Sequence, residues 1–308
     1  MRDIRIGTRE SQLALWQAGQ VKDLLAAHGC PAELVLIKSE GDIDLKTPLY
    51  EIGVQGIFTK TLDIALLNGQ IDIAVHSMKD VPTQLAKGIR HAAVLRRGSY
   101  KDILVTRDAD ASEQLTGHGS PLTIATSSVR RKAQWLHRFP GHNIVNLRGN
   151  VNTRLQKLAG SSWYGAIFAA AGLERIGLRP ENSMDLDWML PAPAQGAVLV
   201  VCREDDNDSY NACRAFHDMH TALCTQVERD FLRGLMGGCS TPISALAAIT
   251  GDTLHFRGNI FSPDGTEKVE IERTVPIDAA AGLGLQAAET IRNNGGEAIL
   301  EGIRNAAK

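Results

Sequence analysis

Arginines recur in this sequence where an apolar strand pattern passes into a helical one. The amino end of a helix carries partial positive charge, so cations there are disfavoured by roughly 0.3 to 1 kcal/mol. Free backbone N–H groups, hydroxyls and guanidinium groups together make an anion site, and the fork of arginine suits carboxylates or phosphates. A solvated surface arginine is the alternative at any single position, but the recurrence predicts a polyanionic ligand. The positions are Arg9, Arg130, Arg131, Arg148 and Arg154.

The stretch VHSMKDVP places a carboxylate at the end of a buried strand. Pro82 biases the preceding residue toward an extended conformation and prevents an immediate helix. Asp80 therefore lies at the carboxyl end of a strand, where ligands bind in parallel sheets. Beside arginines and Lys79 it stays ionised and could stabilise a cation, although a turn or cap carboxylate is the alternative. His76 could carry protons, but a histidine ending a strand is more often structural.

A third candidate is Cys239, in LMGGCSTP. Gly237 and Gly238 free the backbone and Pro242 stops a helix, so the thiol is predicted on a tight loop. A catalytic nucleophile is one interpretation. The remaining cysteines are predicted to be buried and inert, since no CxxC spacing suggests a disulfide framework or a metal site.

Composition excludes several classes of function. The 308 residues include 33 basic and 35 acidic side chains, so a basic surface for nucleic acid is not indicated. GVQGIF is not a dinucleotide fingerprint, and no GKS or GKT occurs. No apolar run is long enough to span a bilayer, and MRDIRIGTRE lacks the core of a signal peptide. We therefore expect a cytoplasmic protein that binds neither nucleic acid nor membrane.

Strand and helix patterns alternate through the first two thirds of the chain, which predicts parallel sheets with helical crossovers. The pattern occurs twice, and IGTRES and IATSSVRR form a weak internal repeat. Strands are expected at 3–8, 32–38, 71–77, 122–127, 143–147 and 164–172, and helices at 11–29, 57–69, 128–139 and 150–160. The fold class is therefore α/β, with two similar domains around a cleft.

The last third of the sequence has a different order of expected helices and strands. Helices are expected at 210–220 and 222–236, followed by strands at 243–250, 253–262 and 268–275 that GD and PDG turn signals join. This predicts a smaller α+β domain with a three-stranded antiparallel sheet. The predicted division is domain 1 at 1–96 and 196–216, domain 2 at 97–195, and domain 3 at 217–308.

Five motifs together resemble the hydroxymethylbilane synthases, also called porphobilinogen deaminases. They are VHSMKDVP, TSSVRRKAQ, NLRGNVNTRL, PAPAQGA and GGCSTPI, in the order and about the spacing of that family. The resemblance covers essentially the whole chain. It implies a transferase of tetrapyrrole (haem) biosynthesis that condenses four porphobilinogen molecules head to tail, releases ammonia and hydrolyses the product to hydroxymethylbilane. It also implies three domains, the first two like periplasmic binding proteins, and a monomer.

The resemblance further implies roles for individual residues. The family carries a covalent dipyrromethane cofactor, one per chain, and Cys239 matches its thioether cysteine. Asp80 matches the catalytic aspartate. Cofactor-binding positions match Lys79, Asp80, Ser127, Ser128, Arg130 and Arg131, and substrate-binding positions match Arg9, Ser11, Thr126, Arg148, Arg154 and Gln195. No metal is implied.

Two positions depart from the family pattern. Gln55 stands where the family has a lysine, and Thr61 where it has a glutamate, which puts a cationic role of that loop in doubt. Two other hypotheses remain open. One is a non-catalytic two-lobed module that binds a polycarboxylate, and the other is a thiol hydrolase that uses Cys239.

Overall fold

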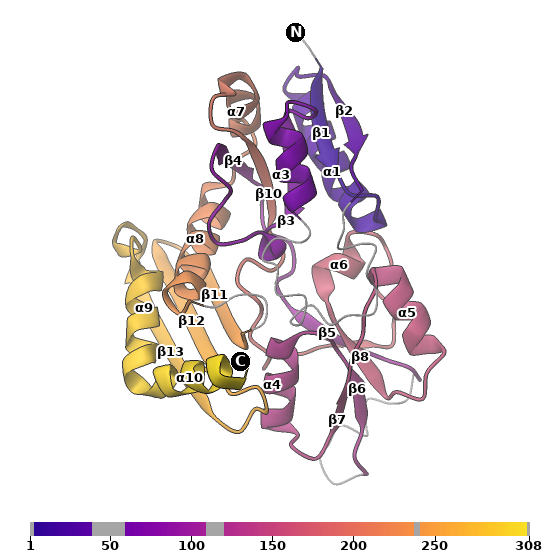
Figure 1. The fold of residues 1–308 in the computed structure, drawn as a ribbon, viewed down its shortest axis with the longest axis vertical. Helices are drawn as coiled ribbons and strands as arrows, with labels where there is room; N and C mark the ends of the chain where they lie inside the picture. The colour runs from indigo at the N-terminus through magenta and orange to yellow at the C-terminus, as the bar shows by residue number, and fades with distance from the viewer. Residues whose placement is uncertain (1–2, 39–58, 109–119, 237–240, 307–308) are drawn as a thin grey trace. The chain divides into compact units, whose positions relative to one another are not determined.

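The computed structural model describes residues 3–38, 59–108, 120–236 and 241–306, which form two compact units (Figure 1). The described residues of unit one are 3–38, 59–98 and 195–223, and those of unit two are 99–108, 120–194, 224–236 and 241–306. The three predicted domain boundaries stay a prediction. No helix in these ranges is both long and apolar enough to cross a membrane.

Unit one is built on a mixed five-stranded sheet of the order β2-β1-β3-β10-β4. Its strands are β1 (Ile4–Thr8), β2 (Ala32–Leu36), β3 (Ile73–Ser77), β4 (Ile89–Val94) and β10 (Val198–Arg203). Its helices are α1 (Gln12–Ala27), α3 (Lys60–Leu67) and α7 (Asn207–Arg214). Apolar side chains of β1, β3 and β10 pack against Val21 and Leu25 of α1 to form the core.

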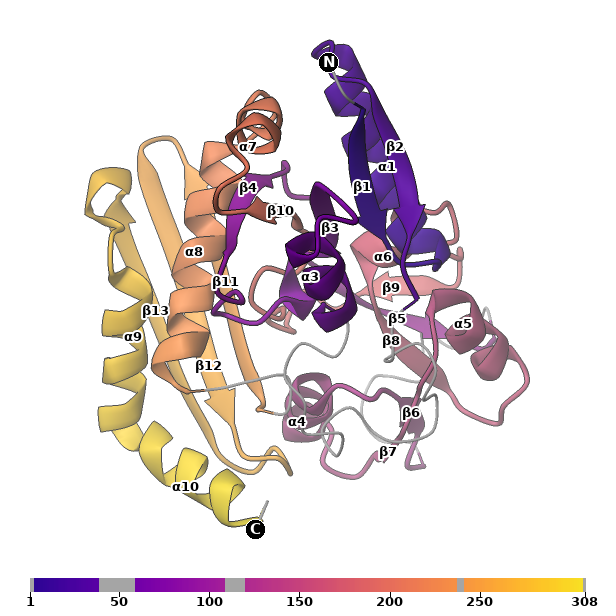
Figure 2. The ribbon, with the colours of Figure 1, turned by 45° about the horizontal axis from the view of Figure 1, so that its top comes forward.

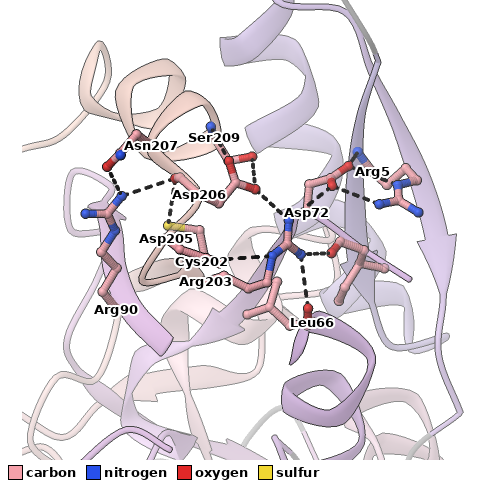
Figure 3. A network of polar contacts seen from close by, with 11 residues as sticks. Arg5, Leu66, Asp72, Arg90, Cys202, Arg203, Asp205, Asp206, Asn207 and Ser209 are labelled. Atoms are coloured by element: carbon pink, nitrogen blue, oxygen red, sulfur yellow. Dashed lines mark hydrogen bonds and ion pairs between the residues drawn. The ribbon is translucent and has the colours of Figure 1, made fainter. Parts of the chain in front are cut away.

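A buried carboxylate ties the chain segments of unit one together (Figure 3). Asp72, only 2% exposed, accepts two hydrogen bonds from the Arg5 guanidinium, at 2.9 and 3.0 Å. Arg203 of β10 lies 3.6 Å from the same carboxylate and also donates to the carbonyl oxygens of Leu66 and Ile71. Charged hydrogen bonds of this kind fix the register between strands and helix.

Unit two contains a second mixed sheet, of the order β7-β6-β8-β5-β9. Its strands are β5 (Asp102–Thr106), β6 (Thr123–Ala125), β7 (Asn143–Val145), β8 (Gly165–Ala169) and β9 (Ser183–Asp185). Its helices are α4 (Val129–Arg138), α5 (Val151–Ala159) and α6 (Ala170–Glu174). In both sheets the first three strands are parallel and share one order, β2-β1-β3 and β7-β6-β8, which confirms the internal repeat.

The predicted parallel strands are present, but both sheets are mixed rather than entirely parallel. β10 runs antiparallel to β3 and β4, and β5 runs antiparallel to β8 and β9. β10 and β5 lie next to the three parallel strands of their sheets. Each follows a segment in which the chain passes from one unit to the other, and each runs in the opposite direction. The crossing segments themselves are joined by a bond from Gly98 N–H to Gly196 O, at 3.0 Å.

The predicted antiparallel sheet is confirmed. It consists of β11 (Ile243–Thr250), β12 (Thr253–Phe261) and β13 (Lys268–Pro276), in sequence order. α8 (Met219–Gly234), which begins in unit one, lies with α9 (Leu283–Ile291) along one face of this sheet, and α10 (Glu297–Ala306) follows (Figures 1 and 2). Phe231 of α8 packs so closely on Gly258 of β12 that a Cβ there would lie 2.7 Å from the ring.

Candidate functional site

The junction after β1 carries the first predicted binding residues, Arg9 and Ser11. Ser11 is the N-cap of α1, and its Oγ accepts a hydrogen bond from Ala14 N–H at 3.3 Å. Thr8, fully buried, donates from Oγ1 to Ala14 O at 3.1 Å. Capping by serine satisfies a helix-start N–H group that would otherwise lack a partner. Arg9 is thus held in a short turn whose strand and helix ends are both fixed.

The end of β3 carries the predicted catalytic carboxylate. Lys79 and Asp80, both half-buried, occupy a single 3₁₀ turn (Met78–Asp80) directly after the strand. Val81 N–H closes the turn on Met78 O at 3.2 Å, and Met78 is buried. One residue earlier, Ser77 exchanges hydrogen bonds with Gln17 of α1 at 3.0 and 3.2 Å. The turn is therefore anchored on both sides, and Asp80 lies at the strand end that the sequence predicts.

His76 is the last buried residue of β3, with 6% exposure. Burial lowers the pKa of His76 from 6.5 to about 4, and the positive charge of Arg9 adds to this effect. The imidazole is consequently neutral at physiological pH, which favours the structural interpretation over that of a proton carrier. The influence of Arg9 also places its charge close to the strand end that leads to Asp80.

The predicted hydroxyl residues of unit two fasten the turn between β6 and α4. Thr126 Oγ1 accepts from Ser128 N–H at 3.2 Å, and Ser128 Oγ caps the helix by accepting from Arg131 N–H at 3.4 Å. Ser127 Oγ accepts from Leu147 N–H at 2.9 Å, which joins the turn to the segment after β7. These groups shape the start of α4, the element that carries the two adjacent arginines.

Arg130 and Arg131 converge on one buried carboxylate. Asp102, the first residue of β5, has no exposed surface; Arg130 Nη1 lies 2.7 Å from its Oδ2, and Arg131 Nη2 lies 2.7 Å from its Oδ1. Arg131 also donates to Ile167 O at 2.9 Å, and Arg130 to Leu190 O at 2.6 Å. Burial alone would raise the pKa of Asp102, but the two guanidinium charges outweigh it and hold that pKa well below its usual range.

The start of α5 carries the last two predicted arginines. Arg148 is 5% exposed, and its carbonyl oxygen accepts from Lys157 Nζ at 3.0 Å. Arg154 donates from Nε to Gly149 O at 2.7 Å. Gly149 has a φ of 117°, a conformation that favours glycine, and a Cβ there would lie 2.7 Å from Thr153 Cγ2. The turn between the two arginines therefore depends on glycine.

The PAPAQGA segment contains a strained backbone position and the predicted residue Gln195. Gln195 is 1% exposed, and its carbonyl oxygen accepts from Arg97 Nε at 2.8 Å within unit one. In unit two, Ala194 has a φ of 61° and its N–H donates to Glu228 Oε2 at 2.6 Å. The other oxygen of Glu228 accepts from Ala247 N–H at 2.7 Å. A fully buried carboxylate thus holds an alanine in the left-handed region.

Two buried carboxylates that hold predicted site segments, Asp102 and Glu228, were not predicted from the sequence. Each left a faint signal: Asp102 opens the apolar run DILVT, and Glu228 interrupts the apolar face of a helix between Val227 and Phe231. An acid inside an apolar stripe is rarely buried without a partner.

Cys239 and Gln55 lie outside the described residues. Thr61 lies in the first turn of α3.

The residues present suit a cofactor that bears carboxylates. The predicted set combines guanidinium groups, Lys79, and the serine-capped starts of α1 in unit one and α4 in unit two. Guanidinium forks and helix amino ends both favour carboxylates. All three guanidinium nitrogens of Arg131 already donate hydrogen bonds within the protein. Nε and Nη2 donate to Asp102, and Nη1 donates to Ile167 O. Arg130 uses Nη1 in its contacts with Asp102 and Leu190 O.

Two family models match this chain. The one described as "Porphobilinogen deaminase, dipyromethane cofactor binding domain" matches residues 4–211, and "Porphobilinogen deaminase, C-terminal domain" matches residues 222–293. Porphobilinogen deaminase of Pelobacter propionicus is 41% identical over 306 residues, covering 98% of this chain and 97% of the relative. That of Syntrophotalea carbinolica is 41% identical over 304 residues, covering 97% of this chain and 96% of the relative.

Solved structures similar to this chain include the methionine binding protein MetQ, with 15% sequence identity and a TM-score of 0.45 over 71% of this chain and 92% of the other. The sequence matches cover nearly the full length of both chains and define a class of enzymes with a dipyrromethane cofactor-binding domain. The chain belongs to the porphobilinogen deaminase family.

Replacing Asp102 by Asn should lower the free energy of unfolding by about 3 to 5 kcal/mol, because two buried guanidinium groups lose their shared counter-charge. Urea unfolding measures this. Asp187→Asn is the matched control, since Asp187 is 74% exposed and contacts only one lysine among the described ion pairs; its change should stay below about 1 kcal/mol. Equal losses in both variants would contradict the role given to Asp102.

His76 should make stability depend on pH between 6.5 and 4. The unfolded histidine binds a proton near pH 6.5 and the folded one only near 4, so the unfolded state is favoured as the pH falls through this window. The loss reaches roughly 3 kcal/mol by pH 4. His76→Gln should remove this component of the wild-type profile, measured by urea unfolding at pH 7 and 4.5, whereas His255→Gln, at an exposed site on β12, should retain it.

Proposed function

We propose that this chain is a hydroxymethylbilane synthase, which condenses four porphobilinogen molecules with loss of ammonia and hydrolyses the product to hydroxymethylbilane. The observation that carries the proposal is the arginine pair at the start of α4, buried on Asp102 and set in a chain that belongs to the porphobilinogen deaminase family. Porphobilinogen bears two carboxylates, so each pyrrole unit added to the growing product adds two negative charges for arginines to bind.

The substrate carboxylates are assigned to the arginines at the strand-to-helix junctions. Arg9 and Arg154 are half-buried and Arg148 is almost fully buried, so each guanidinium acts in surroundings of reduced dielectric constant. Ser11 lies beside Arg9 at the start of α1, and Thr126 lies in the turn before α4. Gln195 lies in the buried crossing segment. We assign these six residues to substrate binding: Arg9, Ser11, Thr126, Arg148, Arg154 and Gln195.

Asp80 is assigned the catalytic role. When ammonia leaves the aminomethyl group of porphobilinogen, the electron-rich pyrrole becomes a cation. A half-buried carboxylate in a fixed turn stabilises such a cation and orients pyrrole N–H groups without rearranging during the reaction. Because His76 is neutral and buried, we do not assign it the stabilisation of a cation at this strand end.

Cofactor attachment is assigned to Cys239, and cofactor binding to Lys79, Asp80, Ser127, Ser128, Arg130 and Arg131. The dipyrromethane, when bound, supplies the primer for chain growth. Ser127 and Ser128 hold the turn that presents Arg130 and Arg131, and Asp102 keeps both guanidinium groups oriented. The proposal also places the enzyme in the cytoplasm, and it treats the enzyme as a monomer, as the resemblance to the family implies. A non-catalytic polycarboxylate module would share the arginines but not need Asp80.

Asp80→Ala should lower turnover by at least about 100-fold, because the substrate-derived cation loses its stabilising carboxylate. The measurement is ammonia release from porphobilinogen by protein purified with its cofactor. Asp23→Ala is the control, since Asp23 is an exposed carboxylate on α1 of the same unit. Substantial activity in Asp80→Ala would refute the assigned role, and porphobilinogen binding by wild type without ammonia release would favour the binding module.

A further inference from the structure

A groove within unit two lies apart from every residue assigned above. Its volume is about 570 Å³, and it runs between α4 and the face of β12 and β13 that looks away from α8 and α9. Its walls are fixed by two hydrogen bonds: Gln134 Nε2 donates to Ser244 Oγ at 3.0 Å, and His137 Nδ1 lies 2.8 Å from Gly265 O. The groove is therefore built between two rigid elements.

Asn259 of β12 lines this groove and is 6% exposed. In the described part of the chain its Oδ1 is fully buried and has no hydrogen-bond partner. Buried polar atoms in native proteins are almost always paired, and an unpaired one costs about 1 to 3 kcal/mol. A carboxamide offers an acceptor and a donor side by side. The site thus contains a recognition group that matches a ligand with the complementary donor and acceptor.

The lining also has an excess of positive charge. Arg138, Arg257 and Lys268 face two carboxylates, Glu270 and Glu272. Lys268 Nζ pairs with Glu270 at 2.5 Å, whereas Arg257 is exposed and makes no ion pair with another described residue. One net positive charge remains, with histidine counted as neutral, and it favours a ligand with a single negative charge.

One wall of the groove carries an arginine and a tryptophan. The Arg138 guanidinium lies 5.0 Å from the centroid of the Trp188 ring, and both residues line the groove. A guanidinium group over an aromatic ring presents an extended planar surface. Such a wall favours a planar ligand over a flexible chain.

We propose that this groove binds a small planar carboxylic acid whose ring carries an adjacent N–H donor and carbonyl acceptor. The Asn259 carboxamide pairs with the donor–acceptor edge, Arg257 binds the carboxylate, and the ring lies along Trp188 and Arg138. This ligand class differs from porphobilinogen, which has two carboxylates and a pyrrole N–H without a neighbouring ring carbonyl. The site is therefore distinct in chemistry from the proposed substrate site.

Orotate has the required ring edge and a single carboxylate, and it serves as the probe. Titration of the full chain with orotate, followed by ligand-detected NMR, should give saturable binding with a Kd of about 1 mM, as expected for a ligand of this size. Uracil, which lacks the carboxylate, and benzoate, which lacks the ring edge, should each bind about tenfold more weakly, the equivalent of one hydrogen-bonded contact.

Asn259→Leu should weaken orotate binding about tenfold while leaving the Tm of the ligand-free protein unchanged or higher, since an unpaired buried amide is removed. Arg257→Gln should weaken orotate but not uracil. Arg273→Gln, on β13 but outside the groove lining, is the charge-matched control and should bind orotate like wild type. Undiminished orotate binding in Asn259→Leu would overturn the proposal, as would equal losses in Arg257→Gln and Arg273→Gln. A lowered Tm of ligand-free Asn259→Leu would also overturn it, because Asn259 would then have a structural role.

Discussion

Two arginine charges buried on Asp102 are the constraint on which unit two depends. Consecutive guanidinium groups at a helix start repel each other and oppose the helix dipole. The unexposed carboxylate of Asp102 contacts both guanidinium groups and offsets one of the two charges. Nη1 of Arg131 donates to Ile167 O, and Nη1 of Arg130 donates to Leu190 O. β5, β8 and α4 are thereby joined at one point. The arrangement keeps positive charge at a helix amino end, where an acidic cofactor can be bound.

Helix α4 consequently serves two purposes along its length. Its first turn is fixed by Asp102 and capped by Ser128, whereas Gln134 in its middle accepts from Leu190 N–H and donates to Ser244 of β11. The rigid contact with β11 creates the groove that Asn259 lines. The same helix thus presents the proposed cofactor-binding arginines and forms a wall of the second proposed site.

Periodicity and turn chemistry were sufficient to predict the repeated β-α-β units, the antiparallel sheet, and the position of Asp80 after β3. They could not predict the mixed sheets, because the direction of β10 and β5, each inside its sheet, is set by where the chain crosses over. The partner of Arg130 and Arg131 was equally hidden: Asp102 lies 28 positions before Arg130 in the sequence (130 minus 102) and meets it only through packing. For His76 the sequence favours a structural role over that of a proton carrier, and its burial supports the structural role.

The central claim is that this chain builds a tetrapyrrole on a covalent primer. The most direct test is the intact mass of the purified, active protein compared with the mass expected from its sequence. A covalent dipyrromethane on Cys239 should add the mass of two pyrrole units. This mass should be lost in Cys239→Ser together with activity, and it should be retained in Cys30→Ser, where a half-buried cysteine at another position is changed. Active protein with the unmodified mass, or full activity in Cys239→Ser, would contradict it.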